Sequence, residues 1–252
     1  MKIQYCSDLH LEFRENKEYL KTNPLKPTGE ILVLAGDIVP FGAMERHGDF
    51  FDYLSKNFKY TYWVPGNHEY YYYDITQKSG FINDKIRKNV FLVNNTSVIH
   101  EDLKLIFTTL WTKITDENQF TIQRRMSDFH VINYKGESFK PFHYNQLHEE
   151  SINFLRQELH VSDNKKIIVV THHVPTFFSY PEIYRGDELN EGFGVELYDL
   201  IEKSNLDYWI FGHHHNNIKE FTIGNTKLLT NQLGYVCRME HELFQSDVIF
   251  HT

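Results

Sequence analysis

Five short apolar runs in the sequence each end in a group of aspartate, asparagine or histidine residues. The groups are Asp8-Leu9-His10, Gly36-Asp37, Gly66-Asn67-His68-Glu69, Thr171-His172-His173 and Gly212-His213-His214-His215. Oxygen and nitrogen side chains of these types bind divalent metals. One Gly-Asp pair after an apolar run is usually an ordinary turn. Five such endings in one chain instead favour a shared metal site.

The runs themselves predict the strands that position these groups. Ile31–Ala35 is apolar without a helical period, which is typical of a strand buried on both faces. Gly36 then allows a tight turn, so Asp37 is expected in the crevice beyond the strand end. The four other runs that we predict as strands are Ile3–Ser7, Tyr60–Pro65, Ile167–Val170 and Tyr208–Phe211.

Helices are predicted between and after these strands from apolar spacing and turn residues. The predicted helices are Glu15–Lys21, Glu45–Phe58, Ile75–Lys88, Tyr144–Leu159 and Val195–Lys203. The further predicted strands are Val90–Val93, Ser97–His100, Leu103–Thr109, Glu220–Ile223, Lys227–Thr230, Tyr235–Val236 and Asp247–Phe250. The alternation indicates an α/β protein.

Two irregular segments, 112–144 and 176–194, are candidates for substrate contact, since long loops in compact domains are often lids or binding loops. The first contains Arg124 and Arg125, which could grip a phosphate or could be ordinary surface arginines. The four tyrosines that begin at Tyr70 could form an aromatic wall beside the site or could pack structurally.

Composition limits the class of protein. The 252 residues suit a single domain over 1–252, and the net charge of −8 argues against a broad nucleic-acid or membrane surface. Cys6 and Cys237 suggest no disulfide framework. The chain shows neither a signal peptide nor a membrane-spanning apolar stretch, so a cytoplasmic location is expected.

Taken in order, the five motifs resemble those of the calcineurin-like metallophosphoesterase family. Leu110-Trp111-Thr112, Met126-Ser127-Asp128, Thr171–Pro175 and Asn231–Tyr235 are similar to its single-domain bacterial members. The resemblance implies a four-layer α/β/β/α fold of two facing mixed β-sheets flanked by helices. It also implies a dinuclear metal centre at the strand ends.

The resemblance also implies a role for each position. Asp8, His10 and His215 would bind the first metal, Asn67, His172 and His213 the second, and Asp37 would bridge them. His68 would be a non-ligand histidine near the leaving-group oxygen, oriented by Glu69 or Asp74. His214 is expected to face outward, and His173 to be a supporting or surface group. The donor set suits Mn, Fe or Zn without choosing among them.

Two cations about 3.5–4 Å apart could acidify a water bound between them, and this metal-bridging hydroxide would attack phosphorus. The resemblance therefore implies a metal-dependent phosphoesterase that acts on a small phosphodiester or phosphomonoester. The alternatives are a metal-dependent nuclease, which the acidic balance disfavours, and a non-catalytic scaffold, which would be expected to have lost ligands. The oligomeric state stays open.

Overall fold

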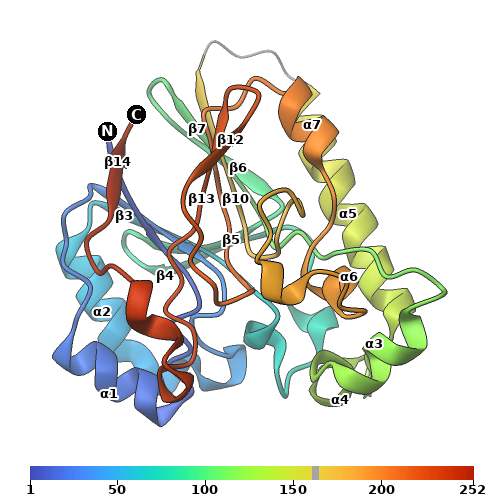
Figure 1. Ribbon diagram of the computed structural model, residues 1–252. Coiled ribbons are helices and arrows are strands. Elements are labelled where there is room, and N and C mark those ends of the chain that lie inside the picture. Colours follow the sequence, from blue (N-terminus) through green and yellow to red (C-terminus); the bar gives the residue numbers. More distant parts are fainter. Residues whose placement is uncertain (161–164) are drawn as a thin grey trace.

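Two six-stranded β-sheets pack face to face, and helices cover both outer surfaces (Figure 1). The computed structural model describes residues 1–160 and 165–252. The fold confirms the predicted class of two facing mixed sheets flanked by helices. None of the described helices has the length and apolarity needed to cross a bilayer.

The first sheet has the strand order β14-β1-β2-β3-β5-β4. Its strands are β1 (Lys2–Cys6), β2 (Ile31–Ala35), β3 (Tyr60–Val64), β4 (Ile82–Arg87), β5 (Val90–Asn94) and β14 (Ile249–His251). The four inner strands are parallel and the two edge strands antiparallel to them. The carboxyl ends of β1, β2 and β3 therefore meet at one edge.

The second sheet has the order β12-β13-β11-β10-β7-β6. Its strands are β6 (Thr96–His100), β7 (Leu103–Thr108), β10 (Lys166–Thr171), β11 (Tyr208–Ile210), β12 (Phe221–Ile223) and β13 (Thr226–Leu229). Here too the inner strands are parallel and the edges antiparallel. Beyond the strands, Ser7 pairs with Gln232, which links the two sheets at the end where the motifs lie.

The sequence of β2 explains the layering, because successive strand residues point to opposite faces. Ile31 and Val33 belong to the core between the sheets, together with Phe107 of the opposite sheet. Leu32 and Leu34 belong to the outer core under helices α1 (Arg14–Thr22) and α2 (Gly48–Asn57). The second sheet is covered in the same way by α5 (Pro141–His160) and α7 (Tyr198–Lys203).

The predicted helix Ile75–Lys88 is wrong. A single 3₁₀ turn, Ile75–Gln77, is followed by β4, which pairs with β5 as an edge strand. Gly80 lies between them with φ +66° in the left-handed region, which ends any helix, and its carbonyl accepts a hydrogen bond from Asn94 Nδ2 at 2.6 Å.

The predicted strand Tyr235–Val236 is also wrong, because Val236–Arg238 forms a 3₁₀ turn between left-handed Gly234 and Met239. The irregular segment 112–144 contains short elements of its own. These are α3 (Gln119–Arg125), α4 (Asp128–Val131) and the hairpin β8 (Asn133–Tyr134) and β9 (Glu137–Ser138). The segment 176–194 ends in α6 (Asn190–Phe193).

Candidate metal centre

The seven predicted ligands come together at the strand ends where the two sheets meet. Asp8 and His10 follow β1, Asp37 follows β2 and Asn67 follows β3. His172 follows β10, while His213 and His215 follow β11. All are buried except His215, whose side chain is 12 % exposed. The first sheet therefore contributes four of these side chains and the second contributes three.

One cluster consists of Asp8, His10, His215 and Asp37. His10 Nε2 lies 2.9 Å from His215 Nε2, and His215 Nε2 lies 3.3 Å from Asp8 Oδ1. Asp37 Oδ2 is 3.7 Å from His10 Nε2.

A second cluster joins His172, His213 and Asn67 to the other oxygen of Asp37. His172 Nε2 is 3.0 Å from His213 Nδ1 and 3.2 Å from Asn67 Oδ1. It is also 3.3 Å from Asp37 Oδ1. Because Asp37 presents one oxygen to each cluster, its geometry suits a carboxylate that bridges two cations.

His10, His172 and His215 each turn one ring nitrogen, the inner one, toward the clusters and the other, the outer one, away from them. Hydrogen bonds to the outer nitrogens indicate that the inner nitrogens face a cation. His10 Nδ1 bonds Glu12 Oε1 at 3.1 Å, His215 Nδ1 bonds Glu240 Oε2 at 2.7 Å, and His172 Nδ1 bonds the Ala35 carbonyl at 2.9 Å. These acceptors require N–H on the outer nitrogens, so in the neutral rings the inner nitrogens hold lone pairs. The lone pairs of His10 Nε2 and His215 Nε2, 2.9 Å apart, repel unless a cation lies between them. The residues therefore fit a metal pair.

The backbone of the centre is strained. Asp8, His10, Asp37, His213 and His215 all have φ between +46° and +80°. Left-handed backbone in residues other than glycine costs on the order of 1–3 kcal/mol each and clusters at functional sites. These conformations turn the side chains out of the strand direction and toward one another.

Glycines make room for ligands from neighbouring strands. A Cβ on Gly36 would lie 2.3 Å from His172 Nδ1, and one on Gly66 would lie 2.2 Å from Asp37 Oδ1. A Cβ on Gly212 would lie 2.5 Å from Asp8 Oδ2. Each glycine that precedes a predicted ligand thus packs against a ligand from another strand, so no other residue fits there without displacing a donor.

Glu69 holds two of the ligand loops together. Its buried carboxylate accepts hydrogen bonds from the backbone N–H of Asp37 at 3.0 Å, Ile38 at 2.6 Å and Gly66 at 2.6 Å. It accepts two more from Val39 N–H and Trp63 Nε1. Burial and the nearby Asp37 raise the pKa of Glu69 to about 8, but all five of these hydrogen-bond partners are donors, which favours a carboxylate that only accepts.

Glu69→Gln is expected to lower the free energy of unfolding, because its amide would turn N–H toward backbone donors. Each unsatisfied buried donor costs about 1–3 kcal/mol, and two backbone donors would face the glutamine N–H₂ group. The free energy of unfolding should therefore fall by about 2–6 kcal/mol. Urea denaturation measures it, with the exposed Glu117→Gln as the matched control. A midpoint equal to that of the control would contradict this role.

His68 lies beside the first cluster as predicted, but its predicted orienting partner is wrong. His68 Nδ1 is 2.9 Å from Glu12 Oε1, whereas Glu69 is occupied by backbone and Asp74 bonds Thr76 and Gly136. The same Glu12 oxygen accepts from His10. Burial raises the pKa of Glu12, but the hydrogen bonds to His10 and His68 outweigh it and lower the pKa to about 2.

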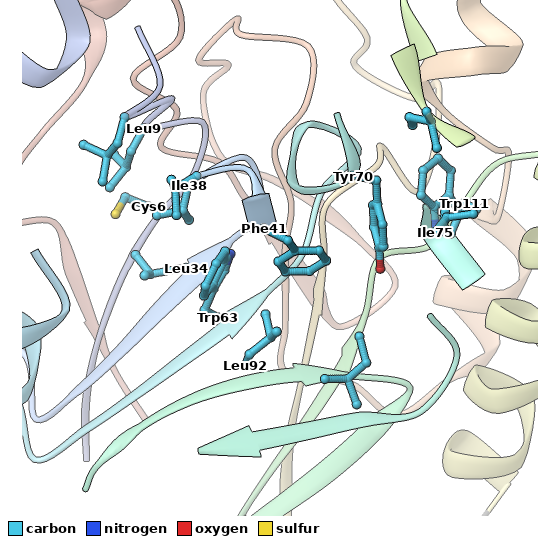
Figure 2. Packing of buried hydrophobic residues seen from close by; sticks show 14 of the residues in the cluster. Cys6, Leu9, Leu34, Ile38, Phe41, Trp63, Tyr70, Ile75, Leu92 and Trp111 are labelled. Atoms are coloured by element: carbon cyan, nitrogen blue, oxygen red, sulfur yellow. The ribbon is translucent and has the colours of Figure 1, made fainter. Parts of the chain in front are cut away.

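Four of the seven predicted ligands border a cavity of about 380 Å³, namely Asp37, Asn67, His213 and His215. Arg125 lines it and lies 3.7 Å from Glu188, whereas Arg124 does not line it. Tyr70 is fully buried in the outer core near Phe41 and Trp111, and cannot reach a substrate (Figure 2). Its neighbour Tyr71 lines the cavity instead, so of the two alternatives for Tyr70 the structural packing is confirmed and the substrate contact is wrong.

The expectation that His214 faces outward is also wrong. His214 is 4 % exposed and lines the cavity, and its Nδ1 lies 3.1 Å from Gln232 Nε2. Burial lowers its pKa to about 4. His173 is a buried supporting group that bonds Tyr144 Oη at 3.0 Å and the Thr109 carbonyl at 3.1 Å.

Sequence reasoning missed three acidic residues at the centre, namely Glu12, Asp128 and Glu240. Glu12 lies two residues after His10, a spacing that could have identified it. Glu240 and Asp128 lie in irregular segments and meet His215 and Asn67 only through the fold. Asp128 was noted only as part of segment 112–144 and of the family motif Met126-Ser127-Asp128.

Three known proteins are similar to this chain in sequence or in fold. A protein of Acanthamoeba polyphaga mimivirus, named uncharacterized protein L509, is 30 % identical over 259 residues, which cover 92 % of this chain and 91 % of that protein. The phosphopantetheinyl hydrolase of Mycobacterium tuberculosis is similar in structure, with a TM-score of 0.71 and 17 % identity over 97 % of this chain and 93 % of that chain. A dimetal phosphatase of Danio rerio has a TM-score of 0.54 and 12 % identity over 92 % of this chain and 87 % of that chain.

These two solved structures share the fold. Residues 1–217 match the family model described as calcineurin-like phosphoesterase. That match spans all five motifs and confirms the resemblance seen in the sequence. The chain belongs to the calcineurin-like phosphoesterase family and is a metal-dependent phosphoesterase.

Proposed function

We propose that the protein hydrolyses a small phosphate ester, either a diester or a monoester, with two cations drawn from Mn, Fe or Zn. The observation that supports this most is the position of Asp37, whose two oxygens face the two clusters beside the cavity. A volume of about 380 Å³ lies in the lower part of the range for small-molecule sites.

In this proposal Asp8, His10 and His215 would hold one cation, Asn67, His172 and His213 would hold the other, and Asp37 would contribute to both sites. When bound, such a pair polarises the phosphoryl oxygens and lowers the pKa of a bound water toward about 7, which provides a nucleophile at neutral pH. The protein keeps the donors fixed through Glu12, Glu240 and the Ala35 carbonyl. Such outer contacts set the ring orientation of a metal ligand.

We assign to His68 the protonation of the leaving oxygen. It lines the cavity, and Glu12 takes its Nδ1, so Nε2 is the nitrogen left to face the substrate and lies 3.3 Å from Tyr235 Oη. Burial lowers the pKa of His68, but Asp37 and Glu12 outweigh it and raise the pKa above its usual value. With Nδ1 bonded to Glu12, a protonated ring would present Nε2–H to a departing alkoxide.

The proposal is tested with metal-stripped protein reloaded with Mn²⁺, Fe²⁺ or Zn²⁺. Bis(p-nitrophenyl) phosphate and p-nitrophenyl phosphate are the substrates, and release of p-nitrophenolate is the measurement. We expect turnover of at least one ester in the loaded protein and none in the stripped protein. The ratio of the two rates assigns the preference for diester or monoester. No turnover of either ester with any of the three metals would contradict the proposal.

A further inference from the structure

Asp128, the first residue of α4, links a predicted metal ligand to the predicted acid. It is 1 % exposed, and its Oδ1 accepts hydrogen bonds from Asn67 Nδ2 and from Tyr71 Oη, both at 2.9 Å. Because the Asn67 amide donates to Asp128, its oxygen is turned toward His172. Asp128 thus fixes which end of the Asn67 amide faces the second cluster.

Tyr71 extends this contact to His68. The Tyr71 ring stacks on the His68 ring with the centroids 4.0 Å apart and an angle of 25° between the planes. Since the Tyr71 hydroxyl is held by Asp128, one carboxylate oxygen positions both Asn67 and the ring beside His68. Asp128 Oδ1 is therefore fully used.

Asp128 Oδ2 is not used in this way. It is buried, and it has no hydrogen-bond partner among the described residues, although Asp128 lines the cavity. Buried polar atoms are nearly always paired, so an unpaired carboxylate oxygen beside a cavity implies a partner that the protein itself does not supply. A carboxylate only accepts hydrogen bonds, so this partner must be a donor.

We propose that Asp128 Oδ2 binds a hydrogen-bond donor, a hydroxyl or an ammonium, on the organic group of the phosphate ester. Asp128 is then a specificity residue as well as a positioning residue. This inference rests on the proposed phosphoesterase function and narrows its substrates to esters of alcohols that bear a second polar group. Plain alkyl esters fill the same space but leave the oxygen without a partner.

The test compares three diesters with the same leaving group. These are ethyl, 2-hydroxyethyl and 2-aminoethyl p-nitrophenyl phosphate, of which only the last two offer a donor, and they distinguish a hydroxyl from an ammonium. The rate is taken from formation of the alkyl phosphate monoester, the product of attack by water, because the 2-hydroxyl can also expel p-nitrophenolate by cyclisation. For the wild-type protein we expect kcat/KM of at least one donor ester to exceed that of the ethyl ester by about 10–100-fold, as for a hydrogen bond to a charged group.

Two variants separate the roles of Asp128. Asp128→Asn keeps an oxygen for Asn67 and Tyr71 but places N–H₂ at the Oδ2 position. It should reduce the donor preference, which is a ratio of kcat/KM values within one variant, to about 1–3-fold, whatever its effect on the rate for the ethyl ester. Asp128→Ala removes both functions and should lower metal content and the rates for all three esters. Asp116→Asn, on an exposed loop outside the cavity, is the matched control and should keep the full preference.

Two results would overturn the inference while leaving the phosphoesterase function intact. One is equal kcat/KM for all three esters in the wild type, and the other is an unchanged preference in Asp128→Asn. If the wild type hydrolyses none of the three diesters and neither nitrophenyl ester, the proposed function fails and this inference fails with it. Turnover of either nitrophenyl ester therefore distinguishes the two failures, and a wild type that hydrolyses p-nitrophenyl phosphate but none of the three diesters also overturns the inference.

Discussion

Replacing Asp37 by alanine is expected to empty at least one metal site and to reduce turnover of either nitrophenyl ester to background. Asp37 presents one carboxylate oxygen to each cluster, Oδ2 at 3.7 Å from His10 Nε2 and Oδ1 at 3.3 Å from His172 Nε2. Its removal takes one ligand from each cation and leaves two like charges without the carboxylate between them. Elemental analysis after dialysis measures the metal content, which should fall to one equivalent or less.

The thermal stability of the same variant gives an independent measurement. A cation at about 100 times its dissociation constant stabilises the folded state by about 2.7 kcal/mol, or roughly 5–10 °C in Tm for a chain of this size. The Tm of the wild-type protein should rise by this amount when metal is added back to the stripped protein, and the Tm of Asp37→Ala should change little or not at all. Asp116→Ala on the surface should behave as wild type. Two full equivalents of metal in Asp37→Ala would refute the bridging role.

His68→Ala is expected to retain both metals but to lose turnover in proportion to the basicity of the leaving group. General-acid catalysis contributes about 10²–10⁴-fold, and it matters most when the departing oxygen is a poor leaving group. We therefore expect a loss of that size for alkyl esters and a much smaller loss for p-nitrophenyl esters. A plot of log kcat against the pKa of the leaving alcohol should become steeper in the variant.

The control for this series is His160→Ala, an exposed histidine at the end of α5. It should have the wild-type slope. If His68→Ala lowered all rates by the same factor, the ring would have a structural or electrostatic role and would not donate the proton. Loss of metal from His68→Ala would likewise remove the acid assignment.

The strand ends were the most predictable part of this molecule. A buried strand such as Ile31–Ala35 has apolar residues on both faces, and its abrupt end at Gly36-Asp37 is a local signal. Parallel strands then bring such ends to one edge without further information. The fold class and the convergence of the seven predicted ligands followed from this pattern together with the family resemblance.

The parts that could not be predicted depend on contacts between distant residues. His68 and Glu12 are 56 positions apart, and Asp128 and Asn67 are 61 apart, so no local pattern indicates either pair. The helix predicted over Ile75–Lys88 was wrong because the apolar spacing of this segment also fits an edge strand. Pairing with β5 and the left-handed conformation of Gly80 favour the strand. His214 turned inward because Gln232, on another segment, accommodates its ring.

The division of the predicted ligands between the sheets bears on how the protein folds. Asp8 and Asp37 come from the first sheet and His213 from the second, and the chain between Asp8 and His213 spans most of the molecule. A half-folded chain with only one sheet docked therefore offers an incomplete set of donors and has little affinity for cations. Bound cations would then leave the refolding rate almost unchanged and would chiefly slow unfolding, since the contacts that they strengthen form late. Removing the cations from such a protein shortens its lifetime more than it hinders its assembly.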